Sequence, residues 1–386
     1  MTRGYAKSLK DALYWPLLLP SALLLCLGMF FLSGISVRFG HRVIDDWQAR
    51  QFTGIAIGLA AAAAVVLVPY KRLVSKAYWF YTANLFLLVL VLMVGSERKN
   101  SMRWLSVFGF DVQPSELMKL TLALTLARFI RFRSSYKTFK GLGTPFLLTL
   151  LPMALVLKQP DLGTALLCIP ILFTMLFVAG ARLRHLLIIA LLGASIIYPI
   201  YLFALRDYQR ARIDVFLSQV NLRSLTEEQR RTHDQNQGYQ LDLSTTAIGS
   251  GGLAGAGSDL HARNALDMVP ERHNDFIFAV VGNRAGILGC LVVLVAYVAL
   301  LVSILAVAAR HRDPAGRLLC VGIFAFFGFQ AFINIAMTVG LMPITGLTLP
   351  FLSYGRSSAV TTLVAIGLVC NVAARPSYEF GRGDFD

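Results

Sequence analysis

Charged residues are scarce in this 386-residue sequence. Asp, Glu, Lys and Arg make up 15% of it, hydrophobic residues make up 56%, and the mean hydropathy is +0.64. A soluble domain usually carries about 25% charged residues. The composition therefore excludes an ordinary soluble domain. It predicts an all-α polytopic membrane protein, because a helix that crosses a bilayer needs about 20 mostly apolar residues.

Disulfide and metal-ligand patterns are also missing. The six histidines are scattered, and no CxxC spacing occurs among the five cysteines, which all lie in apolar segments (Cys26, Cys168, Cys290, Cys320 and Cys370). This excludes a disulfide framework and a structural zinc site. No internal repeat of about 20–50 residues is visible, so we expect a single integral-membrane domain over residues 1–386.

The net charge of +15 does not indicate a nucleic-acid partner. The basic residues lie between apolar runs instead of forming one patch. That distribution is typical of membrane topology and of contact with anionic lipid headgroups. We therefore expect the membrane, and no nucleic acid, as the surroundings of these charges.

Ten apolar runs predict about ten transmembrane helices. They are residues 16–35, 52–69, 77–95, 115–129, 145–157, 162–180, 185–205, 276–309, 318–341 and 351–372. The fourth and fifth runs are short, and either could be tilted, broken or buried among other helices. The long loop between the seventh and eighth spans, about residues 206–275, is the main elaboration of the domain.

Basic residues predict the orientation. The two termini and the short loops on their side of the membrane hold 18 of the 36 Lys and Arg residues, whereas the opposite short loops hold 8. By the positive-inside rule both termini are cytoplasmic. The loop 206–275 then lies outside the cytoplasmic membrane, and Asp275 lies at the outer boundary between membrane and water.

The segment 269–280 changes from charged to apolar within one residue of Asp275. A carboxylate at the mouth of a span is placed where water thins out and a pKa can be tuned. Such a position allows a functional role for Asp275, which is favoured only when the other motifs of the chain are taken together with it. The alternative is that its side chain only caps the N-terminus of the helix that follows.

A second group of polar residues enters the fourth span. Glu116 and Lys119 are three residues apart, so they share one helix face about one turn inside the apolar region. A charge there costs about 2.5–3.5 kcal/mol on insertion scales. The two could form an ion pair that only locks helices together. Alternatively they could line a hydrophilic cavity with Arg103, Gln113 and Asp161.

Two of the neighbouring polar residues also have a structural explanation. Ser115 follows a proline and could cap the fourth span, and Asp161 follows Pro160 and could cap the sixth. In the long loop, Arg210 and Arg212 could hold phosphate oxygens through bidentate contacts, or lie at the interface below lipid headgroups.

Backbone irregularity is predicted at two further places. Five glycines at residues 249–257 would let the backbone approach a substrate or a neighbouring helix closely. Gln330, Asn334 and Thr338 recur at helical spacing before a segment, residues 340–358, that is interrupted by Gly and Pro. Such backbone is tolerated at membrane depth where it is buried or lines a cavity.

Taken in order, these motifs resemble the SEDS family, which includes RodA, FtsW and SpoVE. The resemblance runs from about residue 100 to 372, and it rests on the following motifs: Asn100 with Arg103-Trp104, Gln113-Pro-Ser-Glu116-x-x-Lys119, Gln159-Pro-Asp161-Leu-Gly-Thr, Asp207-Tyr-Gln-Arg210-x-Arg212, Ala247-Ile-Gly-Ser-Gly-Gly252, Pro270-Glu-Arg-His-x-Asp275-Phe-Ile-Phe and Thr345-Gly-Leu-x-Leu-Pro-Phe-Leu-Ser-Tyr-Gly355. The Asp-Tyr-Gln-Arg-x-Arg and Pro-Glu-Arg-His motifs and the short tails are most similar to RodA.

The resemblance implies a peptidoglycan glycosyltransferase that polymerises lipid II outside the bacterial cytoplasmic membrane, for cell-wall elongation and cell shape. Asp275 matches the motif aspartate and would act as general base. Substrate binding is expected of Arg103, Glu116, Lys119, Asp161, Arg210 and Arg212. The basic members of this set would hold the diphosphate leaving group, and a divalent cation such as Mg²⁺ could assist them. The partner implied is a class B penicillin-binding transpeptidase, whose single span would pack near the eighth and ninth helices.

The sequence departs from the usual family pattern close to these motifs. Asn283 and Arg284 replace two glutamates, Arg356 replaces a glycine, and Leu243 and Thr245 replace glutamine and lysine. Fewer acids and more bases near Asp275 predict a lower pKa for its carboxyl group and a weaker base. A transporter of lipid-linked precursors, or a family member that acts only as a scaffold, are the alternative functions.

Overall fold

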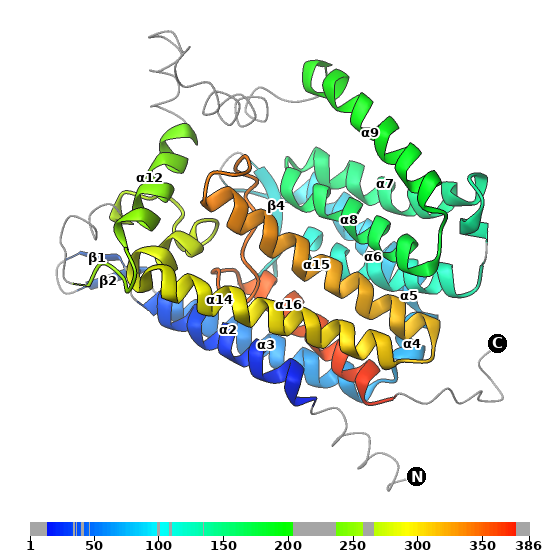
Figure 1. Cartoon of the computed structure of the whole chain (residues 1–386), viewed down its shortest axis with the longest axis horizontal. Helices are drawn as coiled ribbons and strands as arrows, with labels where there is room; N and C mark the ends of the chain where they lie inside the picture. Colours follow the sequence, from blue (N-terminus) through cyan, green and yellow to red (C-terminus); the bar gives the residue numbers. More distant parts are fainter. Residues whose placement is uncertain are drawn as a thin grey trace, which may run out of the picture.

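The computed structural model describes residues 14–33, 35, 37–39, 42–45, 47–98, 101–107, 110–133, 135–203, 237–257 and 266–375. Long helices dominate it and run side by side (Figure 1). They are α2 (Trp15–Ser33), α3 (Trp47–Leu67), α5 (Ala77–Val94), α6 (Pro114–Arg131), α7 (Gly143–Lys158), α8 (Leu162–Ala179), α9 (Leu183–Phe203), α14 (Ile277–Arg310), α15 (Pro314–Thr338) and α16 (Arg356–Ala373).

These helices correspond to the ten predicted spans. Within the described residues, eight helices are long and apolar enough to cross a membrane, namely α2, α3, α5, α7 with the turn before it, α8, α14, α15 and α16. The remaining two are α6 and α9. Along α6, charged side chains interrupt the apolar pattern, and most of its residues are buried against other helices. The buried alternative for the short fourth span is therefore the one observed.

Shorter elements connect the spans. Helix α4 (Tyr70–Ser75) links α3 to α5, and two 3₁₀ turns (Ser135–Lys137 and Lys140–Leu142) precede α7. Helix α12 (Gln237–Ser250) begins the described part of the long loop. The strands were not predicted from the sequence. Strands β1 (Val37–Phe39) and β2 (Arg42–Asp45) pair antiparallel, and β3 (Ser96–Arg98), β4 (Ser101–Val107) and β5 (Phe110–Val112) form an antiparallel sheet.

Helices α6, α15 and α16 form the centre of the bundle, and α3 packs along α16. The α3–α16 contact is close because small residues face each other. A Cβ atom at Gly58 would lie 2.7 Å from the side chain of Leu363, and one at Gly367 would lie 2.9 Å from the backbone of Ala62. Small residues at helix interfaces allow backbones in membranes to approach each other in this way.

The structure moves the start of the last predicted span and adds a break to the eighth. The last helix begins at Arg356, five residues later than predicted, because residues 351–355 are not helical. The eighth span is broken near its start: Gly286 has φ +63° and ψ −160°, which is not helical. Glycine is the residue that takes such a conformation without steric cost.

The glycine-rich segment after α12 packs against this break. A Cβ atom at Gly251 would lie 1.9 Å from the carbonyl oxygen of Gly282, and one at Gly255 would lie 2.0 Å from that of Arg284. The backbone N–H of Ala256 donates to the Asn283 carbonyl at 2.8 Å. The predicted close approach of this segment to a neighbouring helix is confirmed.

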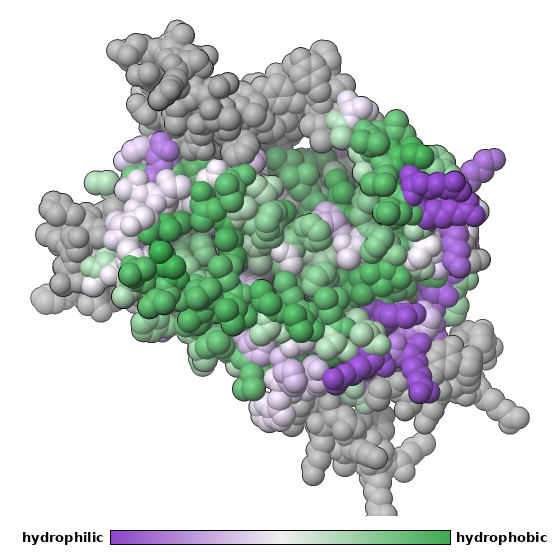
Figure 2. All heavy atoms as spheres, in the orientation of Figure 1, coloured by the Kyte–Doolittle hydropathy of each residue, from purple (hydrophilic) through white to green (hydrophobic). Residues whose placement is uncertain are grey.

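A buried polar cluster holds the opposite end of the bundle together. Tyr70 donates its hydroxyl proton to Asp313 at 2.8 Å, and Arg131 pairs with the same carboxylate at 3.4 Å. Burial and the bond to Asp313 hold the pKa of the Tyr70 hydroxyl above its ordinary value. Figure 2 shows hydrophilic side chains gathered at this end and hydrophobic side chains over the face formed by α2 and α14.

Alanine substitution of Gly251 should destabilise the protein. The added methyl group would overlap the Gly282 carbonyl, and overpacking of this kind typically costs about 1–3 kcal/mol. The measurement is a thermal melt of purified Gly251→Ala protein in detergent. Gly249→Ala is the matched control, because a Cβ atom there has no neighbour within 4 Å. Equal melting temperatures for both variants would contradict this account of the α12–α14 contact.

Candidate functional site

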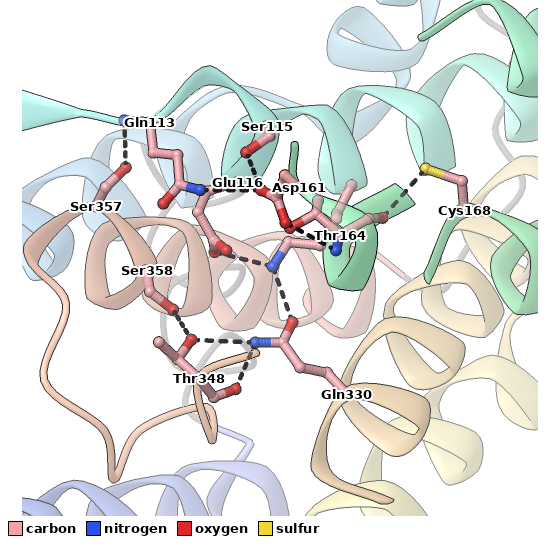
Figure 3. A network of polar contacts seen from close by, with 11 residues as sticks. Gln113, Ser115, Glu116, Asp161, Thr164, Cys168, Gln330, Thr348, Ser357 and Ser358 are labelled. Atoms are coloured by element: carbon pink, nitrogen blue, oxygen red, sulfur yellow. Dashed lines mark hydrogen bonds and ion pairs between the residues drawn. The ribbon is translucent and has the colours of Figure 1, made fainter. Parts of the chain in front are cut away.

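Asp161 is the centre of a buried hydrogen-bond cluster between α6 and α8 (Figure 3). Its carboxylate accepts bonds from Ser115 Oγ at 3.1 Å, from Gln113 Nε2 at 3.2 Å and from the backbone N–H of Thr164 at 3.2 Å. The last bond makes Asp161 the N-cap of α8, as the sequence predicted. The predicted cap at Ser115 is wrong, because Pro114 opens α6 after Gln113 and Ser115 turns to Asp161 instead.

Arg103 reaches the same cluster from strand β4. Its Nη1 lies 4.0 Å from Asp161 Oδ1, and its Nε donates to the Gln159 carbonyl at 3.0 Å. A further bond from Nη2 goes to the Pro160 carbonyl. The guanidinium therefore ties the small sheet to the turn between α7 and α8. The structure brings Arg103, Gln113 and Asp161 together, as the sequence predicted, and it adds Ser115, which was expected to cap α6.

Glu116, in the first turn of α6, and Lys119, one turn further along, form a buried ion pair. Lys119 Nζ lies 2.9 Å from Glu116 Oε2, and its side chain is fully buried. The ammonium also donates to Gln330 Oε1 at 2.8 Å and lies 4.6 Å from the centre of the Phe326 ring. Both of these contacts come from α15. The pair thus connects two central helices and neutralises its own charge in a low-dielectric environment.

The irregular segment between α15 and α16, residues 339–355, lies beside this pair. Gln330 Nε2 donates to the Thr348 carbonyl at 2.8 Å, and the Thr348 hydroxyl lies 3.1 Å from that of Ser358 (Figure 3). Asn334, one turn after Gln330, donates to the Leu347 carbonyl at 2.6 Å. The side-chain amides of α15 therefore donate to two successive carbonyls of the loop, whose backbone forms neither helix nor strand. Irregular backbone is tolerated at membrane depth when its polar groups are satisfied in this way.

Asp275 is half-buried, two residues before α14 begins. The N-cap position of α14 belongs to Phe276, whose side chain makes no capping bond, so Asp275 is not the N-cap. Its backbone carbonyl accepts a bond from Asn334 Nδ2 at 2.9 Å. Because the same amide holds Leu347, the segment that carries Asp275 is joined through α15 to the loop beside the buried ion pair.

The residues that depart from the family pattern have partners of their own. Asn283 donates to Ser250 Oγ at 2.9 Å and to the Ala247 carbonyl at 3.2 Å, which ties α14 to α12. Arg284 donates to the Phe31 carbonyl at 3.2 Å. The guanidinium of Arg356 lies 3.0 Å from Asp111 Oδ2. These three departures therefore have structural roles in this chain, and the lower pKa expected for the Asp275 carboxyl group stays a prediction.

Other predicted site residues are not described. Asn100, Arg210 and Arg212 lie outside the described residues, so their expected contacts remain predictions. For the divalent cation, the residues that the structure describes contain no group of three or more His, Cys, Asp or Glu side chains arranged to hold a metal ion. The acidic groups at the site, Glu116 and Asp161, instead face Lys119 and hydrogen-bond donors. We therefore assign no step to a metal.

Sequence reasoning missed several polar contacts around the site. Gln51 on α3 donates to the Ser353 carbonyl at 3.3 Å and accepts from the Gly355 N–H at 2.9 Å. The Arg356–Asp111 pair joins α16 to strand β5. The only signal in the sequence was a polar residue next to an apolar run, which does not name its partner.

Three comparisons place the chain among known proteins. Residues 15–378 match the family FTSW_RODA_SPOVE, described as "Cell cycle protein". The chain is 33% identical over 366 residues to a probable peptidoglycan glycosyltransferase FtsW of Geobacter metallireducens, covering 93% of this chain and 94% of that protein. It is 31% identical over 353 residues to the peptidoglycan glycosyltransferase MrdB of Escherichia coli, covering 92% of each.

A solved structure shares the fold. It concerns the structural coordination of polymerization and crosslinking by a peptidoglycan synthase complex, and one of its chains superposes with a TM-score of 0.78 at 31% sequence identity. The match covers 95% of this chain and 98% of that chain. The all-α polytopic membrane fold predicted from the sequence is confirmed. The FtsW and MrdB relatives are similar to the chain to nearly the same degree, so identity does not separate the subfamilies.

Removing one member of the Glu116–Lys119 pair should harm folding more than removing both. Lys119→Met alone leaves the Glu116 carboxylate without its counter-charge, and Glu116→Gln alone leaves the Lys119 ammonium without its own. Breaking a buried pair in this way typically costs about 3–5 kcal/mol. The double variant is neutral and close in size to the parent. Thermal melts and yields of the three variants test this, and single variants that melt like the parent would rule out a stabilising buried pair.

Breaking the Arg356–Asp111 pair should also lower the stability of the protein, by a smaller amount. Arg356→Gln removes one charged partner of Asp111, and we expect a loss of about 1–3 kcal/mol because a mostly buried carboxylate loses a charged hydrogen bond. Adding Asp111→Asn should restore part of the loss. A melting temperature for the double variant below that of Arg356→Gln would contradict the coupling.

Proposed function

The chain belongs to the FtsW/RodA/SpoVE family of SEDS peptidoglycan glycosyltransferases, and from this membership we propose that it polymerises lipid II with Asp275 as the general base. A hydroxyl oxygen of the acceptor sugar attacks the anomeric carbon of the lipid-linked donor with inversion. The bond from that carbon to the diphosphate breaks, and the lipid diphosphate leaves. The hydroxyl proton passes to the Asp275 carboxylate, which must lie within about 2.6–3.2 Å of it.

The observation that carries this proposal is the anchoring of Asp275. The residue lies just before a long apolar helix, and its backbone is tied to the centre of the bundle by the buried Asn334 amide. A base has to be held in a fixed position to be effective. Asp275 is also not fully buried, as a base that a substrate hydroxyl has to reach requires.

Substrate binding is assigned to a set of charged groups on the same side of the bundle as β4. Arg103 and Asp161 lie together at the N-terminal end of α8. On α6, Glu116 directly follows Ser115, and Lys119 lies one turn further along the helix. We propose that Arg103, together with Arg210 and Arg212, contacts the diphosphate, since a guanidinium binds phosphate oxygens in bidentate fashion. In the described conformation Lys119 is occupied by Glu116 and Gln330, so its part in substrate binding stays a prediction.

Topology and domain organisation complete the proposal. The protein is a multi-pass membrane protein, and its basic residues favour cytoplasmic termini in the bacterial inner membrane. In that orientation loop 206–275 is extracytoplasmic and the polymerisation site faces the outer side. The whole chain, residues 1–386, then forms one integral-membrane domain.

A role in cell-wall elongation is favoured by the motifs that are most similar to RodA. We also propose a class B penicillin-binding transpeptidase as partner, since the related solved structure concerns a complex that coordinates polymerization with crosslinking. Its single span would pack against the exposed apolar faces of α14 and α15, which include Leu291, Val295, Val298 and Phe332.

The decisive experiment is Asp275→Asn. It removes the proton acceptor but keeps the size of the side chain, so we expect formation of glycan strands to fall at least about 10²-fold, the usual contribution of a positioned acid or base. Polymerisation of labelled lipid II is followed on gels beside a thermal melt and a lipid II binding assay.

The matched control is Asp267→Asn. It removes an equal charge eight residues earlier, from a carboxylate that is 68% exposed and pairs with Arg272. This variant should polymerise at nearly the parent rate. If Asp275→Asn also polymerises at the parent rate, the base is another residue.

A further inference from the structure

Three consecutive backbone carbonyls lead up to α14, and each accepts a hydrogen bond from the C-terminal third of the chain. The His273 carbonyl accepts from the Tyr354 N–H at 2.8 Å, and the Asn274 carbonyl accepts from Ser353 Oγ at 2.6 Å. The Asp275 carbonyl accepts from Asn334 Nδ2 at 2.9 Å. We infer that Asn334 and Ser353 are positioning residues that hold the Asp275 backbone in place for catalysis, an inference that rests on the proposed function.

These carbonyls depend on outside donors because the helix does not use them. The first bonds of α14 go to the Phe276 carbonyl, which accepts from the N–H groups of Ala279 and Val280. A backbone carbonyl buried without a donor is costly, since it loses water and gains nothing in return. The three outside donors therefore help to hold segment 273–275 in one conformation.

Asn334 carries two of the contacts that matter. Its side chain is fully buried, and its amide nitrogen donates to the Asp275 carbonyl and to the Leu347 carbonyl at 2.6 Å. One amide thus fixes the distance between the backbone of Asp275 and the loop 339–355. Loss of this amide leaves both carbonyls without that donor at the same time.

Ser353 has a double role of the same kind. Its hydroxyl donates to the Asn274 carbonyl and accepts from the Leu349 N–H at 2.7 Å. The bond to Leu349 closes the turn in which Phe351 has φ +70°, a left-handed conformation that a non-glycine residue takes only when its surroundings hold it there. The hydroxyl therefore joins the shape of this turn to the segment that carries Asp275.

The loop also links these donors to the buried ion pair. Gln330 lies one turn before Asn334 on the same face of α15, and the two amides bind the adjacent carbonyls of Thr348 and Leu347. The other end of the Gln330 side chain accepts from Lys119. A continuous set of contacts therefore runs from the Lys119 ammonium through α15 and the loop to the Asp275 backbone.

The expected consequence is specific to the chemical step. Displacing a catalytic group by about 1 Å can cost about 10²-fold in rate, while binding of a large substrate depends on many other contacts. Asn334→Leu, which keeps the approximate size and removes both donated bonds, should therefore lower kcat for lipid II polymerisation at least about 10-fold. Its KM for lipid II should stay within about twofold of the parent value.

The control is Thr338→Val in the same helix. Thr338 lies one turn after Asn334, is fully buried, and its hydroxyl donates only to the Ile335 carbonyl of its own helix among the described contacts. Its removal tests whether any buried polar loss in α15 lowers kcat. We expect kcat and KM near the parent values.

Ser353 provides the second variant in case Asn334→Leu does not fold. Ser353→Ala removes the bond to the Asn274 carbonyl and should lower kcat with KM unchanged, whereas Ser353→Thr keeps a hydroxyl and should recover most of the rate. For every variant, kcat and KM are measured with full-length protein in detergent and fluorescent lipid II. A thermal melt gives the third readout, the melting temperature. The inference is overturned if Asn334→Leu or Ser353→Ala has the same kcat as Thr338→Val. It is also overturned if the lower kcat is fully explained by a smaller folded fraction of the variant.

A change at Asp275 separates this inference from the proposed function. In protein with Asp275→Glu the carboxylate is already displaced, so adding Asn334→Leu should lower kcat by a smaller factor than it does in the parent. Equal factors in both backgrounds would mean that Asn334 does not act through Asp275. If Asp275→Asn itself keeps the parent rate, the assignment of the base fails instead.

Discussion

The buried ammonium of Lys119 sets the arrangement of the central helices. A cation with no exposed surface must find opposite charge and hydrogen-bond acceptors inside the protein, because the membrane offers neither. Glu116 supplies the charge from the same helix, and Gln330 supplies an acceptor from α15. This requirement fixes α6 against α15 in one register, and the other end of Gln330 then fixes the loop that follows α15.

The loop between α15 and α16 is the second constraint. Its backbone is neither helix nor strand, so side chains of neighbouring helices have to satisfy its polar groups. Gln330 and Asn334 do so from α15, and Gln51 does so from α3. The loop itself donates hydrogen bonds from Ser353 and Tyr354 to the segment that ends at Asp275. The segment that we assign to catalysis is thus held by the same contacts that make the irregular loop possible.

Residues that depart from the family pattern form contacts with neighbouring elements. Arg356 starts α16 and pairs with Asp111 of β5, which also accepts a bond from Ser106 at 2.5 Å. Asn283 joins α14 to α12 near the break at Gly286. The Arg356–Asp111 pair therefore attaches the β3–β5 sheet to α16, and the bonds of Asn283 attach α12 to α14.

The sequence by itself determined the class of fold and much of the local structure. Apolar runs placed ten helices, the three-residue spacing placed Glu116 and Lys119 on one face, and the proline before Asp161 indicated its N-cap. These features depend on residues close together in the chain, so periodicity and capping preferences reveal them. The resemblance to a known family added the enzymatic class, which the comparisons confirm.

Only the tertiary structure decided which buried polar groups meet. The sequence did not show that Ser115 bonds Asp161 instead of capping α6, or that Asn334 holds the Asp275 backbone from 59 residues away. Arg356 and Asp111 are 245 residues apart, and no local pattern pairs them. In a low-dielectric interior every such group needs a partner, but the identity of that partner is set by how the helices pack, and packing is a property of the whole chain.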